Sequence, residues 1–505
     1  MTIEAATATL PGPGPSPPTR WSAWVYSVAA ATVAFVVVYG WLIVQMHASY
    51  STQAFDFGIF DQGLWLLSRF EDPFVTLRGL HLFGDHASLV MIPLAPLFWM
   101  WDDPHALLLF TVAALGAGGP IVYATARRLE LPAPIAAALA GGFLLYPAIT
   151  WATWWNFHPE MLAIPMLLGS FLLTTQRRPQ LAAALLLATL LVKEDAALVV
   201  VPMALWLGCT KMWSLRQALL VAAGGVAFFV LNVAVILPSF TPTGELVYLQ
   251  RYGRFGQTLP KVIVELITNP GLTLSVLFSG RSLGYLAKML LPLPTCLLRP
   301  SFLLVGAPVT AANLLSGQLG QQDIKFHYSA YLTAIVAIAA VLGAVRLNRL
   351  LVGSRGPGRR PITVAGVAVG VAVVALAANV AWSPSPIGAE RDQWFRPDAF
   401  DEQRSARLAV IPDDAVVSVD PFLAPHFAHR ERVYMFPNPF EALAWGVEGV
   451  PPLPDPDAVE WVALRPVAYP PTDEHHAVIE RLRDSDEFDV VVDDGDLLIL
   501  RRVES

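Results

Sequence analysis

Two carboxylates lie among aromatic residues in the stretch Tyr50–Gln62, directly after the first long apolar segment of the chain: Asp56 and Asp61. An ionised carboxylate that faces lipid costs a few kcal/mol or more, so such acids lie at the membrane surface or in a protein cavity. We predict that Asp56 acts as a general base or electrostatic partner for a reacting hydroxyl and that Asp61 is also catalytic. Five residues apart on a helix, their side chains would point about 140° from each other, so they share a substrate atom only if Asp56 precedes the helix. The alternative for Asp56 is a helix cap.

Further ionisable residues interrupt apolar sequence in three short motifs: Gly84-Asp-His86, His158-Pro-Glu160 and Lys193-Glu-Asp195. Trp154 and Trp155 before the second motif fit a membrane-surface aromatic belt, which does not explain the His and the acid. The alternatives are a structural interfacial histidine for His86 and a solvated hairpin tip for the Lys193 triplet. We predict catalytic roles for Asp56, Asp61, His86 and Glu160, and substrate binding by Asp85, His158, Lys193, Glu194, Asp195, Arg251, Arg254 and His327.

Arg251 and Arg254 belong to this set because they lie in a loop after Pro238, where guanidinium groups can pair with a phosphate. Exposed arginines without a specific role are the alternative. The His and acid residues are also ligand types for a divalent metal ion, but no pair has the i,i+4 spacing of a helical metal site. The cofactor therefore stays open. The chain has neither a Gly-rich phosphate loop nor a serine nucleophile elbow, which argues against a nucleotide-driven pump and a serine hydrolase.

The composition is that of a helical membrane protein. Of 505 residues, 55% are hydrophobic and 14% are charged, outside the usual range of soluble proteins. The net charge of −7 gathers largely after Ala389, and no Lys/Arg-rich run with aromatics indicates nucleic-acid binding. Cys209 and Cys296 lie in apolar segments and are interpreted as small buried hydrophobic residues.

Basic residues favour cytoplasmic loops, and they divide the apolar sequence into about eleven transmembrane helices. The expected spans are 24–46, 104–125, 133–150, 159–175, 180–192, 196–210, 216–238, 283–298, 301–315, 328–346 and 362–382. This pattern places the amino terminus in the cytoplasm and the carboxyl terminus outside, in a multi-pass protein of the plasma membrane.

The scheme requires that Leu89–Trp101 does not cross, and this segment is short and contains two prolines. We interpret it as interfacial or re-entrant. The first outer loop, 47–103, then carries a helix with apolar residues at Phe57, Phe60, Leu64 and Leu67, predicted to lie on the bilayer. A second such segment is Val262–Phe278. With this topology, the candidate site residues converge at the outer ends of the spans.

The sequence thus predicts three parts: a disordered Pro-rich cytoplasmic tail at 1–20, a transmembrane domain at 21–385 and an extracytoplasmic α/β domain at 386–505. In the last part, short strands are expected at 415–419, 433–436 and 460–464. A helix at 475–483 precedes a hairpin of 488–492 and 497–500, with its turn at Asp494-Gly495.

Five ordered motifs resemble the bacterial and archaeal family of predicted membrane proteins called domain of unknown function 2079. They are Phe55-Asp-Phe-Gly-Ile-Phe-Asp-Gln62, Phe83-Gly-Asp-His86, Asn156-Phe-His-Pro-Glu160, Lys193-Glu-Asp195 and Phe326-His-Tyr328. The resemblance extends from about Trp41 to Tyr434. That family is similar to polytopic glycosyltransferases of the C-type fold, which take a sugar from a polyprenyl-phosphate donor on the outer membrane face. The resemblance implies that Asp56 is the catalytic residue of the acidic motif, although the chain lacks the adjacent acid pair common in such enzymes.

We therefore predict a membrane glycosyltransferase of the cell envelope that transfers a sugar from a polyprenyl-phosphate donor to an acceptor on the outer face. Its partners would be membrane lipid and that donor. One alternative is a transporter or flippase, although polar residues gathered at one face favour chemistry over passage. The other is a non-catalytic envelope assembly protein.

Overall fold

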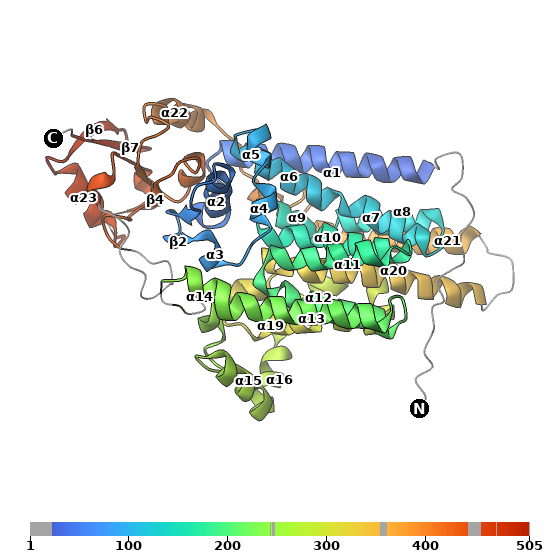
Figure 1. Ribbon diagram of the computed structural model, residues 1–505. Coiled ribbons are helices and arrows are strands. Elements are labelled where there is room, and N and C mark those ends of the chain that lie inside the picture. Colours follow the sequence, from blue (N-terminus) through green and yellow to red (C-terminus); the bar gives the residue numbers. More distant parts are fainter. Residues whose placement is uncertain are drawn as a thin grey trace.

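The helices of the chain form a bundle, and a small β-sheet domain lies at one end of it (Figure 1). The computed structural model describes residues 23–242, 244, 248–353, 361–442, 456–470 and 472–503. The tail expected at residues 1–20 and part of the basic cluster 346–360 lie outside the described residues.

Six helical segments within the described residues are long and apolar enough to cross a membrane. They comprise α1 (Ala23–Ala48), α6 and α7 (Pro104–Gly116, Gly118–Arg128), α8 and α9 (Ala133–Leu144, Pro147–Trp154), α13 and α14 (Leu215–Leu231, Leu237–Phe240), α20 (Ala330–Gly353) and α21 (Pro361–Trp382). The expected class, a polytopic helical membrane protein, is thus confirmed.

The other expected spans are shorter helices, and the count of about eleven spans is not confirmed. They are α10 (Ala163–Thr175), α11 (Pro179–Ala188), α12 (Ala197–Cys209), α17 (Gly280–Leu290), α18 (Pro300–Leu303) and α19 (Ala307–Leu315). A helix of 13 residues such as α10 is about 20 Å long, less than the hydrocarbon core of about 30 Å. The tight turns η2 (Pro159–Leu162) and η3 (Thr189–Val192) extend α10 and α11. Irregular backbone at membrane depth is tolerated where it lines a protein cavity.

The loop between α1 and α6 folds into a layer of short elements at the end of the bundle where the sheet lies (Figure 1). These are η1 (Ala54–Gly58), α2 (Ile59–Ser68), β1 (Phe74–Val75), β2 (Leu80–His81), α3 (Leu82–Asp85), α4 (Met91–Leu94) and α5 (Leu97–Met100). The expected helix is present as α2, but it does not lie on the bilayer. Eight of its ten residues are buried, because α4, α5 and β1 of the same loop pack against α2 and the C-terminal domain contacts its polar residues Asp61 and Gln62.

The segment 89–101 folds into α4 and α5, and its interfacial or re-entrant placement stays a prediction. α4 and α5 have four residues each, too short to cross a bilayer. The side chains of Trp99 and Met100 are exposed, as expected for aromatic and apolar residues at the membrane surface.

The second predicted amphipathic segment forms two helices, α15 (Leu259–Thr268) and α16 (Pro270–Leu277), joined at Asn269. The Asn269 side chain accepts a hydrogen bond from Leu272 N and caps α16. Val262 of α15 is buried, whereas Ile267 is 72% exposed. α15 therefore has one face toward protein and one apolar face away from it.

The C-terminal domain contains a five-stranded sheet in the order β4-β3-β5-β7-β6. The helices are α22 (Ala399–Leu408) and α23 (His476–Arg483), and the strands are β3 (Val417–Val419), β4 (Val433–Met435), β5 (Trp461–Leu464), β6 (Phe488–Asp493) and β7 (Leu498–Arg502). β3 pairs in parallel with β4 and β5, with Val417 opposite Val433 and Trp461, and β5 pairs antiparallel with β7. The β6–β7 hairpin turns at Gly495, whose φ of +84° favours glycine. The predicted strands and helix are present, whereas α22 was not predicted.

The sheet joins the rest of the chain through one of its faces. Val419, Met435 and Ile499 belong to the same hydrophobic core as the first loop and the bundle. Val462 and Leu500, on the other face, form a separate core with residues of α23. The connections α7–α8, α10–α11 and α12–α13 lie at the opposite end of the bundle (Figure 1), and at or beside them are the basic residues Arg127, Arg128, Arg177, Arg178 and Lys211.

Candidate functional site

Asp56 lies on a π-helical turn, η1, that leads directly into α2. The turn is preceded by Gln53, whose extended backbone occupies the capping position, so Asp56 lies inside the turn and does not cap it. Asp56 Oδ1 is 3.4 Å from Nε2 of His158. π-helical turns occur frequently at functional sites.

His158 reaches Asp56 because the chain reverses sharply after α9. Asn156 has a φ of +65°, a left-handed conformation that Asn adopts more readily than most residues. His158 and Glu160 follow this reversal. The His158 ring stacks on His327 from η10 (His327–Ser329), with ring centroids 3.6 Å apart.

Asp56, His158 and His327 form a candidate cation site. Each offers one ligand atom, and these atoms lie within 4.8 Å of one another. The Nδ1 atoms of both histidines are buried, without a hydrogen-bond partner among the residues that the structure describes. Imidazole and carboxylate together suit a divalent transition metal ion. The donor set therefore fits such an ion.

Glu160 lies between a lysine and a histidine in a buried ion-pair network. Lys193 Nζ donates to Glu160 Oε1 at 3.0 Å, and Nε2 of His327 is 3.6 Å from the same oxygen. Both side chains of the Lys193–Glu160 pair are almost completely buried. Asp195, next to this pair, accepts a hydrogen bond from the Tyr331 hydroxyl at 2.8 Å.

A second network surrounds Asp85, at the end of α3. Its Oδ1 accepts hydrogen bonds from Nε of Arg78 at 3.1 Å and from the Tyr248 hydroxyl at 2.6 Å. Burial alone would raise the pKa of Asp85, but the charges of Arg78 and His86 hold this pKa below its ordinary value. Asp85 is therefore an ionised acceptor that fixes the two donors.

His86 connects this network to the Lys193 motif. Its Nδ1 is 3.0 Å from Oε1 of Glu194, and its ring stacks on Tyr248 with centroids 4.5 Å apart. Arg251 lies over the same Tyr248 ring, with its Cζ 4.1 Å from the centroid. A stack of imidazole, phenol and guanidinium thus lies between the two networks.

Two cavities meet at this stack. The first, about 530 Å³, is lined mainly by polar residues: Phe55, Asp56, Phe60, Arg78, Asp85, His86, His158, Glu160, Tyr248, Gln250, Arg251, Gly317, Gln318, His327 and Tyr328. The second, about 410 Å³, shares Asp85, His86, Tyr248 and Arg251 with the first. It adds Lys193, Glu194 and Asp195, and it extends between apolar side chains of α12, α13, α15 and α19.

The structure thus brings together ten of the twelve predicted site residues and leaves two apart. Seven line the first cavity, and the Lys193 triplet lines the second. Arg254 is exposed and lies outside both linings. Asp61, predicted to be catalytic, is completely buried, and its nearest basic partner is His429 of the C-terminal domain. It is separated from the cavities because it lies on the other side of the η1–α2 element.

Three further residues, which were not predicted from the sequence, also line the first cavity: Arg78, Tyr248 and Tyr328. Arg78 follows Asp56 in the same loop and is the only basic residue between Arg69 and His81, which is a weak signal for a partner of a buried acid. Tyr248 carries no comparable signal, since a tyrosine in a loop is common.

A family model described as predicted membrane protein, domain of unknown function 2079 (DUF2079), matches residues 46–491. The chain belongs to the DUF2079 family. The match covers the first loop, the bundle after α1 and most of the C-terminal domain, so the five motifs quoted above fall within one family region. No curated protein sequence matches this DUF2079 chain.

Two solved structures with some likeness to this DUF2079 protein are both of the oligosaccharyltransferase of Archaeoglobus fulgidus. The apo form has a TM-score of 0.47 and 12% identity, covering 87% of this chain and 69% of that chain. The form tethered through a disulfide bond to an acceptor peptide with the NVT sequon has a TM-score of 0.40, 13% identity and the same coverage. Scores of this size carry no argument about the activity of this chain.

Proposed function

We propose that this protein is a membrane glycosyltransferase that moves a sugar from a polyprenyl-phosphate donor to an acceptor hydroxyl on the outer membrane face. One observation carries the proposal: a polar cavity with Asp56, His158 and Glu160 adjoins a cavity with largely apolar walls, and the two share Asp85, His86, Tyr248 and Arg251 in their linings. A ligand that fills both needs a polar reacting head and a long apolar tail. A lipid-linked sugar has that shape.

The apolar side continues toward the lipid-facing surface. A third cavity, about 350 Å³, shares Leu198, Phe229 and Pro308 with the second and is lined almost completely by apolar atoms. Val226 and Leu205 in this lining are more than one third exposed. An isoprenoid chain could thus leave the site along the apolar cavity lined by α12, α13 and Pro308 of α19, and burial of its methylene groups would contribute about 0.8 kcal/mol each.

The donor phosphate would lie at the junction of the first two cavities, beside Arg251. A guanidinium is suited to phosphate oxygens, and the Arg251 side chain is held between the rings of Tyr248 and Tyr328. The sugar would then extend toward Asp56 and His158. In this arrangement, the bond from the sugar to the donor phosphate would lie between Arg251 and the carboxylate of Asp56.

The reaction we propose is a single displacement. The acceptor oxygen attacks the anomeric carbon, the bond from that carbon to the phosphate oxygen breaks, and the phosphate keeps the electron pair. Asp56 takes the proton of the acceptor hydroxyl. A positioned general base typically contributes on the order of 10² to 10⁴ in rate. His86 and Glu160 act in this proposal by holding Tyr248, Arg251 and Lys193 in charge-balanced networks around the phosphate.

A divalent cation held by one oxygen of Asp56 and by His158 and His327 would supply positive charge that makes the acceptor hydroxyl easier to deprotonate, while the second Asp56 oxygen takes the proton. Treating the purified protein with a chelator tests this part, since a required cation makes the loss of turnover reversible by adding Mn²⁺ or Zn²⁺.

The test of the proposed function is an assay of purified protein with a panel of polyprenyl-phosphate sugars. We expect release of polyprenyl phosphate that depends on both donor and acceptor. Movement of intact donor between the leaflets of a vesicle, without release of polyprenyl phosphate, would instead identify a flippase and contradict the proposal.

A further inference from the structure

We propose that the segment Pro421–Val433 of the C-terminal domain is a clamp that positions Asp56, and that Asp61 and His429 are its positioning residues. The proposal rests on the proposed function for the part that concerns catalysis. Its physical basis is the contact between this segment, called the clamp below, and the η1–α2 element that carries Asp56.

The clamp holds the η1–α2 element at its beginning. The backbone N–H of Ala54, the first residue of η1, donates to the carbonyl oxygen of Pro421 at 2.8 Å. Gly58, the last residue of this turn, faces Pro425, since a Cβ there would be 3.7 Å from the Pro425 ring. Asp56 thus lies on a turn whose two ends both contact the clamp.

The centre of the contact is a histidine between two carboxylates. Nε2 of His429 is 3.3 Å from Oδ2 of Asp61, and Nδ1 is 3.1 Å from Oδ1 of Asp102. Asp102 also pairs with Arg69, the residue that follows α2. The Asp61 side chain is completely inaccessible to solvent, and a buried carboxylate is costly without a charged partner. His429 is the basic partner found within 4 Å of it among the described residues.

Gln62, the next residue of α2, makes an equally specific contact. Its Nε2 donates to the hydroxyl of Thr76 at 2.8 Å and is 3.3 Å from the carbonyl oxygen of Arg430. The Thr76 hydroxyl donates in turn to the carbonyl oxygen of Val433 at 2.7 Å. Asp61 and Gln62, the last two residues of the motif Phe55–Gln62, therefore contact the clamp. Asp56, the first acid of the same motif, lines the polar cavity.

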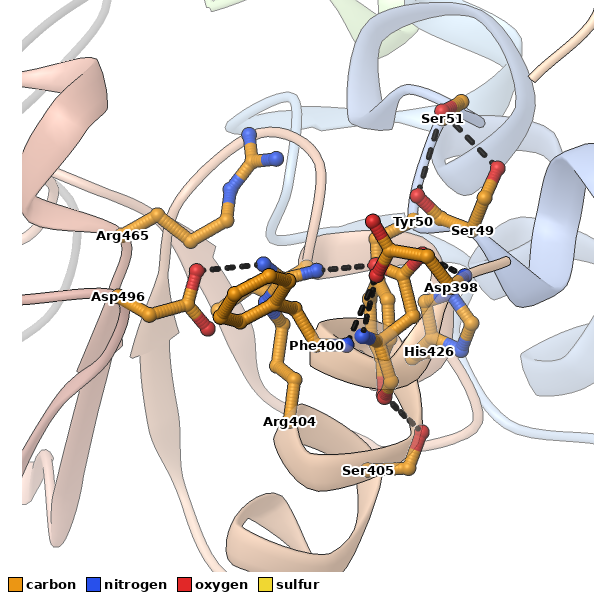
Figure 2. Close-up of polar contacts among 12 residues, drawn as sticks. Ser49, Tyr50, Ser51, Asp398, Phe400, Arg404, Ser405, His426, Arg465 and Asp496 are labelled. Atoms are coloured by element: carbon orange, nitrogen blue, oxygen red, sulfur yellow. Dashed lines mark hydrogen bonds and ion pairs between the residues drawn. The ribbon is translucent and has the colours of Figure 1, made fainter. Parts of the chain in front are cut away.

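A second set of contacts holds the clamp against the end of α1. His426 Nε2 lies 3.0 Å from the carbonyl oxygen of His47, and its ring is 4.1 Å from the ring of Tyr50. The Tyr50 hydroxyl is 2.8 Å from that of Ser405 in α22. Figure 2 shows this region, where Arg404 of the same helix pairs with Asp496 beside Tyr50. The clamp is therefore supported on both sides.

The experiment compares wild type with His429→Gln, Asp61→Asn and the double variant. His476→Gln is the control, because it removes a histidine from the same domain where the side chain contacts Glu480 and Tyr469, away from the clamp. The first readout is amide hydrogen exchange of residues 54–62. The second is kcat and KM for the donor that wild type accepts.

We expect His429→Gln to lower the protection of residues 54–62 by about tenfold or more, since it leaves Asp61 buried and unpaired. We expect kcat to fall on the order of tenfold or more with little change in KM, because a displaced general base affects the reaction step. The double variant removes the unpaired charge and should recover much of both losses. His476→Gln should behave as wild type.

Unchanged exchange of residues 54–62 in His429→Gln would overturn the clamp, whatever the activity. Lower protection with unchanged kcat would overturn the positioning role. If wild type turns over no donor, the proposed function fails, while the exchange measurement still decides whether the clamp exists.

Discussion

Lys193 is a buried cation among acids, and we expect that replacing it mainly lowers the free energy of unfolding of the protein. Lys193→Met leaves Glu160 buried without the lysine that now donates to it, and an uncompensated buried charge costs about 3–5 kcal/mol. The matched control is Lys325→Met, which breaks the half-exposed pair with Glu390 and should cost about 1 kcal/mol or less. Thermal unfolding in detergent measures both. Equal shifts would contradict the view of a buried, charge-balanced network.

His429 gives the clamp a predictable dependence on pH. The charged groups that face it are Asp61 from α2, and Asp102 and Asp103 from the segment before α6. Burial would lower the pKa of His429, but these carboxylates outweigh burial and hold the pKa above its ordinary value. A raised histidine pKa stabilises the docked state below about pH 6.5, and this contribution is lost as pH rises through the raised value.

In wild type, the protection of the amides of residues 54–62 against hydrogen exchange, corrected for the intrinsic exchange rate, should therefore decrease as the pH is raised from neutral to alkaline. The same pH change should have little effect in His429→Gln. An equally steep fall in that variant would mean that another group titrates.

At the scale of single residues, the sequence could reveal the acids and histidines of the cavity because polar residues stand out in apolar segments. Asp56, His158 and Lys193 were found in this way. His426 and His429 lie in ordinary loop sequence, and only the tertiary structure shows their contacts with the first loop. For the same reason, the sequence could not show that Asp61 contacts the C-terminal domain, because its partner, His429, lies more than 360 positions away along the chain.

We expect a large side chain introduced into helix α15 to weaken donor binding on the face that lines the second cavity, but not on the exposed face. Val262 lines the second cavity, so Val262→Trp should fill the path of the isoprenoid chain and raise KM for a long-chain donor by about tenfold. Ile267→Trp, on the exposed face of the same helix, is the control and should leave KM unchanged. Donor kinetics with both variants check this. A larger effect of the Ile267 change would place the lipid elsewhere.

At the scale of elements, the buried strands were predictable because runs such as Ala415–Val419 are short, largely apolar and rich in the β-branched residue valine. α22 was missed because its sequence, Ala399–Leu408, is largely polar. Its one usable signal is Asp398, which caps the helix together with Asp401 in a capping box. α2 was recognised as a helix but placed on the bilayer, since its amphipathic pattern does not say whether lipid or another domain covers it.

At the scale of the whole molecule, the topology is the prediction most open to a simple test. The basic connections lie at one end of the bundle and the sheet domain at the other (Figure 1), and basic loops prefer the cytoplasm. A reporter that is active only in the cytoplasm should therefore be silent when fused after residue 505. Activity of that fusion would place the cavities on the cytoplasmic side and contradict transfer on the outer face.

The central claim is that Asp56 acts as a charged group on a lipid-linked sugar in the polar cavity. The most direct measurement is turnover of the same polyprenyl-phosphate sugar by wild type and by Asp56→Asn, with folding checked by thermal unfolding. Asn keeps the shape of the side chain but cannot take the acceptor proton, so we predict an intact protein whose turnover is lower by on the order of 10² or more. Asp61→Asn should be milder. Full turnover by Asp56→Asn would contradict the claim.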